Sequence, residues 1–212
     1  MPHPLGLRER KKAQTRETIV RCAMELFAER GFDATTIADI AEAADIAPRT
    51  FFGYFPSKEA VVFHDFEEMF ADFETRLRSR PKDQTAFEAL RTWIVEMITR
   101  VEENGETEME DQRRCLIHDT PSLDAHERAN MGRFHELLTE CVAADLDVPA
   151  DSLRANMVAA AAVAALESLR ELKDDDTSGP EQAIAVMDEV LVFLVGGLDA
   201  LRATSEAGAA SD

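Results

Sequence analysis

Cysteine, glycine and proline are all scarce in this sequence. The 212 residues include only three cysteines, nine glycines and eight prolines. Because Cys22, Cys115 and Cys141 are odd in number and widely spaced, they suggest neither a disulfide framework nor a metal site. The low glycine and proline content and the lack of strand-like alternation predict an all-α fold.

Long apolar runs and signal segments are also missing. No stretch approaches the roughly 18 uninterrupted apolar residues that a membrane-spanning helix needs. The N-terminus is basic and has no apolar region of the kind found in secretory signals. We therefore expect a cytoplasmic protein that has no membrane partner.

The sequence patterns of common enzyme classes are absent as well. A two-metal helical bundle uses Glu-x-x-His pairs, yet no Glu stands three residues before any of the five histidines. There is no Gly-x-Ser-x-Gly elbow, phosphate-binding loop or dinucleotide fingerprint. We expect no catalytic residues, no cofactor and no metal.

Basic residues are few, and their distribution is uneven. The chain has 42 Asp and Glu against 23 Lys and Arg, a net charge of −19. Residues 1–58 hold nine bases and eight acids, or +1, which leaves −20 for the remainder. Since an acidic body repels phosphate, only the N-terminal part can face DNA. A flexible basic arm is predicted before the first helix, comprising Arg8, Arg10, Lys11 and Lys12.

The segment 35–58, TTIADIAEAADIAPRTFFGYFPSK, predicts a helix-turn-helix. Thr36 and Asp39 have the spacing of a capping box at a helix start. A stripe of small or branched apolar residues follows at helical spacing: Ile37, Ile40, Ala41 and Ala44. Pro48 suits the first turn of the next helix, which needs no backbone donor there. The helix from about Pro48 to Tyr54 is the predicted reader of the major groove.

This segment resembles the tetracycline-repressor-like (TetR) family of one-component regulators. The likeness covers about Arg16 to Val62, including LFAERGF at 26–32 and TFFGYFPSKE at 50–59. It implies a DNA-binding transcriptional regulator, a repressor that a small ligand releases from its operator. It also implies a three-helix DNA-binding domain followed by a helical domain for ligand binding and dimerisation.

The DNA-binding residues are assigned position by position. Arg49 is the one side chain of the recognition helix that can grip a guanine edge in two places, and Thr50 can reach a base or a phosphate. The resemblance implies phosphate contacts for three further residues, Thr36, Tyr54 and Lys58. Ala47 and Gly53 depart from the family pattern, since a Ser and a larger polar residue are frequent there.

About nine helices in two domains and a tail are expected for the whole chain. The helix-turn-helix domain with its basic arm spans 1–56, the ligand-binding and dimerisation domain spans 57–204, and 205–212 is a disordered tail. A long fourth helix from Ser57 is predicted to link the domains. Residues 104–111 break the helical pattern and are predicted to form a loop.

The body has enough large apolar residues to line an elongated ligand cavity. The candidate ligand-binding residues are Phe66, Phe70, Trp93, Met97, Phe134 and Leu138. The same residues also suit a solid core, and both interpretations stay open at this point.

An acyl-CoA ester is one candidate for the ligand. The run 49–58 is similar to that of mycofactocin-type regulators, some of which recognise fatty acyl-CoA, and the stretch 113–123 is similar to that group's pocket entrance. An anionic head would need cations such as Arg113 and Arg114 to offset the acidic body. A neutral apolar ligand has no such requirement.

The last two helices have more apolar surface than one buried face requires. Residues 157–166 are nearly apolar all round, and the helix from Pro180 to Arg202 has several apolar stripes. These features favour a homodimer seam, and the family resemblance also implies a four-helix bundle between two copies. The predicted interface residues are Ala161, Ala162, Leu194 and Leu198.

A two-fold dimer determines the form of its operator. Its two recognition helices must meet major-groove faces about 34 Å apart, or a multiple of that distance. The DNA partner should therefore be an inverted repeat, and a ligand that alters this spacing should weaken binding. The alternative hypothesis is a ligand-binding or interaction protein of the same fold without sequence-specific DNA binding, because Ala47 and Gly53 weaken the match.

Overall fold

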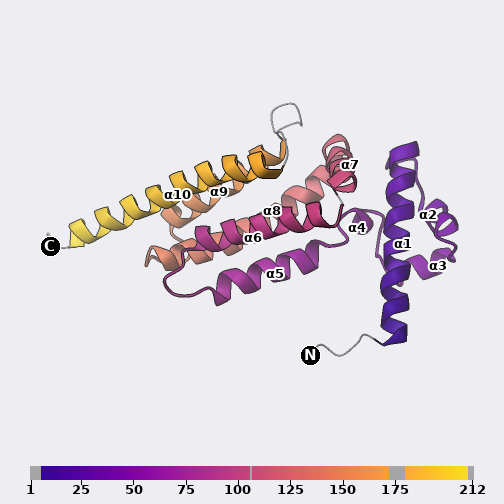
Figure 1. Ribbon diagram of the computed structural model, residues 1–212, viewed down its shortest axis with the longest axis horizontal. Coiled ribbons are helices and arrows are strands. Elements are labelled where there is room, and N and C mark those ends of the chain that lie inside the picture. The colour runs from indigo at the N-terminus through magenta and orange to yellow at the C-terminus, as the bar shows by residue number, and fades with distance from the viewer. Residues whose placement is uncertain (1–5, 106, 172–179, 210–212) are drawn as a thin grey trace. The chain divides into compact units, whose positions relative to one another are not determined.

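The structure, a computed structural model, describes residues 6–105, 107–171 and 180–209, and every regular element in these ranges is a helix (Figure 1). The all-α expectation is confirmed, with ten helices where about nine were expected. They are α1 (Leu7–Arg30), α2 (Ile37–Ala43), α3 (Pro48–Phe51), α4 (Glu59–Val62), α5 (Phe66–Ser79), α6 (Ala86–Glu103), α7 (Thr107–Asp119), α8 (Pro121–Asp145), α9 (Leu153–Glu171) and α10 (Pro180–Ala209).

Two compact units make up the chain. The first comprises residues 1–67 and 108–127, and the second comprises 68–107 and 128–212. The domain limits given by the sequence stay a prediction. Residues 205–209 are helical, however, because α10 continues to Ala209 through an alanine-rich stretch with high helix propensity. The rest of the predicted disordered tail, 210–212, lies outside the described residues.

The first unit is organised around α1. This helix contacts α2 and α4, and α2 contacts α3 (Figure 1). The buried core draws large apolar side chains from all of these helices and from α7 and α8, including Ile19, Phe27, Ile40, Phe51, Phe55, Val61, Ile117 and Leu123. Since this core holds α2 and α3 together on α1, the three-helix arrangement predicted from the sequence is present.

The predicted long fourth helix is interrupted. α4 ends at Val62 and α5 begins at Phe66, so residues 63–65 separate two helices. Side chains satisfy the backbone at this break: an Arg16 guanidinium nitrogen of α1 donates to the His64 carbonyl oxygen at 2.5 Å. The Arg16 guanidinium also lies 4.6 Å from the centre of the Phe55 ring. These tertiary contacts, which helical periodicity does not reveal, stabilise the break.

Two further sequence expectations are wrong in detail. α1 begins at Leu7, so the four basic residues of the predicted flexible arm belong to its first turns. Glu9 caps this start by accepting a hydrogen bond from the Gly6 backbone at 3.0 Å. α7 begins at Thr107, within the predicted loop 104–111. Its acidic residues Glu108 and Glu110 lie in the first turn, where negative charge favours a helix.

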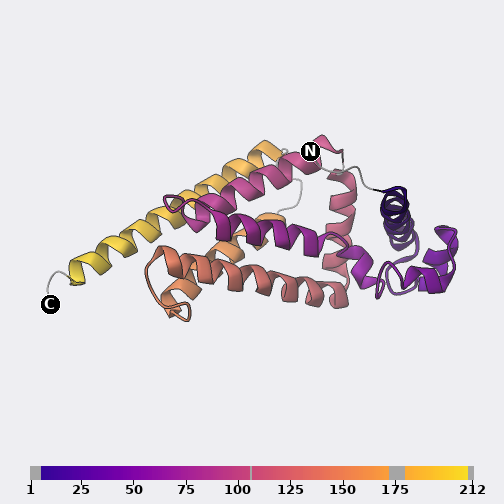
Figure 2. The same cartoon turned by 90° about the horizontal axis from the view of Figure 1, so that it is seen from below.

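The second unit has an aromatic core contributed by three helices. Phe73 of α5, Trp93 of α6 and Phe134 of α8 lie with their ring centroids 4.8 to 5.9 Å apart. α10 packs along α6 and α9 (Figures 1 and 2). Arg91 of α6 and Asp188 of α10 join these helices through two bonds of 2.6 Å.

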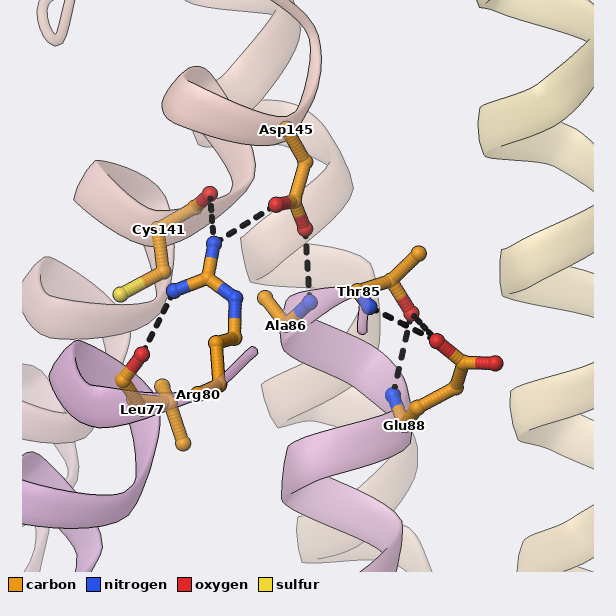
Figure 3. Close-up of polar contacts among 7 residues, drawn as sticks. All are labelled: Leu77, Arg80, Thr85, Ala86, Glu88, Cys141 and Asp145. Carbon is orange, nitrogen blue, oxygen red and sulfur yellow. Dashed lines mark hydrogen bonds and ion pairs between the residues drawn. The ribbon is translucent and has the colours of Figure 1, made fainter. Parts of the chain in front are cut away.

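A buried ion pair fixes the ends of α5 and α6 on α8 (Figure 3). Arg80, just beyond α5, donates to the Asp145 carboxylate at 2.6 Å, to the Cys141 carbonyl at 3.1 Å and to the Leu77 carbonyl at 2.6 Å. The second carboxylate oxygen of Asp145 accepts the Ala86 N–H at 2.6 Å. Asp145 therefore serves both as the partner of a buried cation and as an acceptor for the first turn of α6.

Membrane helices and paired cysteines are absent from the described residues. None of the described helices combines the length and apolar character of a bilayer-spanning segment. Cys22 and Cys141 are buried free thiols, whereas Cys115 is exposed.

Candidate functional site

The helix-turn-helix has the local geometry that its sequence predicts. Thr36 caps α2 in a capping box: its hydroxyl accepts the Asp39 N–H at 3.2 Å, and the Asp39 carboxylate accepts the Thr36 N–H at 2.8 Å. Asp45 adopts a positive φ of 52° in the turn, a conformation that Asp tolerates better than most residues. Pro48 occupies the first position of α3, as predicted, and Ala47 provides no side-chain cap.

The recognition helix presents one buried and one exposed side. Phe51 is fully buried beneath α3, and Arg49 and Thr50 are exposed. Within the described part of the chain, the Arg49 guanidinium has no hydrogen-bond or ion-pair partner. Tyr54 is half-buried and packs against the core of the first unit. Arg49 and Thr50 are thus available to a DNA groove, in agreement with their assignment from sequence.

Thr36 is already engaged within its own motif. Its N–H and hydroxyl both donate to Asp39, at 2.8 and 2.5 Å. Hydrogen bonds from Thr36 lower the pKa of Asp39, so the carboxylate is ionised at neutral pH. A phosphate at Thr36 would therefore have to approach a negative charge, which weakens the case for this contact.

Lys58 also has partners within the first unit. Its ammonium nitrogen lies 2.6 Å from the Phe32 carbonyl oxygen and 3.3 Å from the Thr35 carbonyl oxygen. The same nitrogen is 4.2 Å from the centre of the Phe32 ring. Lys58 therefore holds the connection between α1 and α2 in place, a role that the spacing of residues in the sequence did not indicate.

The two candidate arginines of α7 are paired with acids. Arg113 is largely buried and donates to Asp65 at 2.7 Å and to Glu110 at 2.6 Å. Burial raises the pKa of Asp65, but the charge and hydrogen bond of Arg113 outweigh burial and hold that pKa below its ordinary value. Arg114 pairs with Asp111 and is exposed. Both cations are thus already balanced, and Phe66 lies buried in the same unit.

The other ligand candidates lie in the second unit. Trp93, Phe134 and Leu138 are buried, and Phe70 contacts Phe134 edge to face at 5.2 Å. The Trp93 indole N–H donates to Asp72 at 3.0 Å. Most of these side chains therefore pack on one another, which is the solid-core interpretation that the sequence left open.

A small cavity opens beside this aromatic core. It has a volume of about 110 Å³ and is lined by Asp72, Arg76, Trp93, Glu96, Met97 and Arg100. Arg76 pairs with both carboxylates, at 3.1 Å to Asp72 and 2.6 Å to Glu96. This cavity is smaller than the roughly 300 to 1,000 Å³ of typical ligand pockets, so a long ligand would require the core to open.

The predicted interface residues differ in exposure. Ala162 and Leu194 are buried within the second unit, whereas Ala161 is exposed. The side chain of Leu198 lies outside the described residues. Large exposed apolar side chains instead occur at four other positions of α9 and α10: Leu153, Met157, Val192 and Phe193. The apolar character of these helices hinted at such a surface, but periodicity did not show which stripe faces outward.

These features define a class of protein: a helical regulator with a helix-turn-helix unit and a second helical unit. Residues 19–64 match the family described as "Bacterial regulatory proteins, tetR family", and residues 84–199 match the "MftR C-terminal domain". The chain belongs to the TetR family of transcriptional regulators. Its membership, predicted from the motif at 50–59, is confirmed, and with it the class of a DNA-binding regulator rather than an enzyme.

Two curated relatives support this assignment. The chain is 33% identical to the HTH-type transcriptional regulator TcmR of Streptomyces glaucescens, over 71% of this chain and 68% of TcmR. It is also 33% identical to MftR of Mycobacterium tuberculosis, named for regulation of mycofactocin biosynthesis, over 68% of this chain and 71% of MftR.

Solved structures share the fold. SmeT of Stenotrophomonas maltophilia, in complex with triclosan, aligns with a TM-score of 0.62 and 18% identity, covering 84% of this chain and 90% of SmeT. Thermus thermophilus FadR, in complex with lauroyl-CoA, aligns with a TM-score of 0.53 and 25% identity, covering 85% and 93% of the two chains.

Proposed function

We propose that this regulator is a cytoplasmic homodimeric repressor that binds an inverted-repeat operator through α3. The observation that carries the proposal is the pair Arg49 and Thr50, exposed on a short helix whose other side is anchored by the fully buried Phe51. A rigid support of this kind positions the exposed side chains for base edges. Tyr54 and the basic first turns of α1 are the proposed phosphate contacts, while Thr36 and Lys58 shape the motif.

Dimerisation through α9 and α10 would set the operator spacing. On α9, Leu153, Met157, Ala160, Ala161 and Ala164 are all exposed and recur at i, i+4, i+7, i+8 and i+11, so they share one helix face. On α10, Val192 and Phe193 are exposed. Apolar residues on both helices suit a seam between copies, where burial removes them from water. This surface replaces the buried Ala162 and Leu194 as the proposed interface.

Arg49→Ala should relax sequence preference at one position of each half-site. A bidentate contact to guanine is worth about 1–3 kcal/mol of discrimination, so the variant should lose about 5- to 150-fold of its preference for that guanine. Arg49→Lys is the matched control, because it keeps the charge and loses the two-point geometry. Operator libraries bound at constant salt would measure both variants. Unchanged preference in Arg49→Ala would show that another element reads the bases.

The alternative, a protein of this fold without sequence-specific DNA binding, is tested separately. A gel-shift assay with the promoter beside its own gene, competed with unrelated DNA, should show a specific complex for the repressor. Equal competition by both DNAs would support the alternative.

We also propose that an apolar ligand, with acyl-CoA as the first candidate, releases the operator. Three observations support this: the similarity to MftR over the C-terminal region, the lauroyl-CoA complex of the related FadR, and the apolar core beside the small cavity. Entry of a long ligand must separate Trp93, Met97 and their neighbours, which gives a physical route from binding to a change of shape.

Operator release titrated with acyl-CoAs of increasing length tests the ligand proposal. Each buried methylene contributes about 0.8 kcal/mol, so the releasing concentration should fall about fourfold per methylene until the cavity ends. A double variant, Arg113→Ala with Arg114→Ala, tests the anionic head: it should weaken acyl-CoA far more than the matching free alcohol. Release indifferent to chain length would contradict an apolar-tail ligand, and equal effects on both ligands would remove the arginines from the site.

A further inference from the structure

The recognition helix carries an exposed aromatic ring that the proposed contacts leave unused. Phe52 follows α3 directly, and 57% of its surface is exposed. The other prominently exposed large apolar side chains of the described residues lie at the start of α1 or on α9 and α10. Exposed apolar surface of this size is unfavourable in water, so an aromatic ring beside the base-reading residues requires an explanation.

Local packing fixes the direction of this ring. Phe51, fully buried, meets Phe52 edge to face, with ring centroids 5.7 Å apart and planes at 88°. Gly53 follows, and a Cβ there would lie 3.2 Å from the Thr50 carbonyl oxygen. The chain therefore turns tightly behind Phe52, and no side chain at residue 53 covers the ring.

Phe52 and Arg49 lie three residues apart, the spacing that places side chains on one helical side. Both are exposed. Positions at this spacing have Cβ atoms about 5–6 Å apart, which spans about two base-pair steps of 3.4 Å along a DNA strand. A guanine-reading cation and an apolar ring can thus meet neighbouring base pairs.

The chemistry of the major groove then limits what Phe52 can recognise. Its ring has no hydrogen-bonding group, and the apolar group on a major-groove base edge is the C5-methyl of thymine. We infer that Phe52 reads a thymine methyl within about two base pairs of the guanine read by Arg49. The inference rests on the proposed DNA-reading role of α3. A 5-methylcytosine at the same position presents the same methyl group, so Phe52 should favour it over cytosine.

The test replaces thymine by deoxyuridine, which removes only the methyl group. Operator duplexes with single replacements across a half-site are titrated against the wild-type dimer and Phe52→Ala by fluorescence anisotropy. At one position, wild-type affinity should fall about fourfold, the worth of burying one methyl-sized group, and about 16-fold when both half-sites are changed. Phe52→Ala should not distinguish thymine from deoxyuridine at that position.

Two controls make the result specific. Phe52→Leu keeps an apolar group and should retain part of the methyl preference. Cytosine and 5-methylcytosine at the same position should differ for the wild type and not for Phe52→Ala, which separates a methyl contact from a general preference for A·T pairs. Because Phe52 is exposed, the thermal melting of the variants should match the wild type.

The outcomes separate this inference from the proposed function. Equal sensitivity of the wild type and Phe52→Ala to deoxyuridine at every position would overturn the methyl contact, even if Arg49→Ala still relaxes guanine preference. No specific binding to the thymine operator would instead refute the proposed repressor function itself. A loss of dimers in Phe52→Ala, measured by sedimentation, would assign the ring to a protein contact and also overturn the inference.

Discussion

Asp145→Ala is expected to lower the free energy of unfolding by about 3–5 kcal/mol, the typical cost of removing one partner from a buried ion pair. The side chains of Arg80 and Asp145 are only 13% and 10% exposed. Asp145 raises the pKa of Arg80 despite its burial, so the guanidinium stays charged and would be left without its counter-ion. The Ala86 N–H would also lose its acceptor. Denaturant unfolding followed by circular dichroism measures the change.

Glu140→Ala is the matched control for this prediction. Glu140 also lies on α8 and also pairs with an arginine of the α5 end, Arg78, at 2.9 Å. The Arg78 and Glu140 side chains are 52% and 53% exposed, however. Exposed pairs contribute at most about 1 kcal/mol, so Glu140→Ala should barely change stability. Equal effects of the two substitutions would show that burial does not set the worth of these pairs.

Phe193→Glu is expected to convert the proposed dimer into monomers and to weaken operator binding by about 10²- to 10⁴-fold, the usual gain from linking two binding modules. The side chain is 78% exposed within one chain, so the substitution should not disturb the fold of the unit. At a seam between copies, the new carboxylate would be buried without a partner, which is strongly unfavourable. Sedimentation velocity and anisotropy with the same operator measure the two effects.

Ala161→Glu, on the exposed face of α9, should produce the same result, because Ala161 belongs to the proposed seam. Ala162→Glu is less informative, since Ala162 is buried inside the unit and a charge there would disturb folding itself. Ala144→Glu is the control: it adds the same charge at an exposed position of α8. Intact dimers of both Phe193→Glu and Ala161→Glu would place the seam elsewhere.

Local signals account for much of the DNA-binding motif. The capping box of Thr36 and Asp39 and the helix start at Pro48 depend on residues a few positions apart, and the structure has both. The start of α1 was less accessible, because helix propensity in its basic first turns prevails over the expectation of a free arm. Nothing local indicated that Lys58 would reach the carbonyls of Phe32 and Thr35, 26 and 23 residues away.

The sequence by itself determined the all-α fold, the helix-turn-helix and the family, because helical periodicity and caps are local and the 50–59 motif is contiguous. Only the tertiary structure decided which apolar stripe is buried, that Arg113 is balanced by Asp65 and Glu110, and that Arg80 and Asp145 form a buried pair. Periodicity places side chains on a helix face, but whether that face meets solvent, a core or another helix depends on long-range packing. Burial and pairing in turn decide which charged and apolar groups remain available to DNA, a ligand or a second copy.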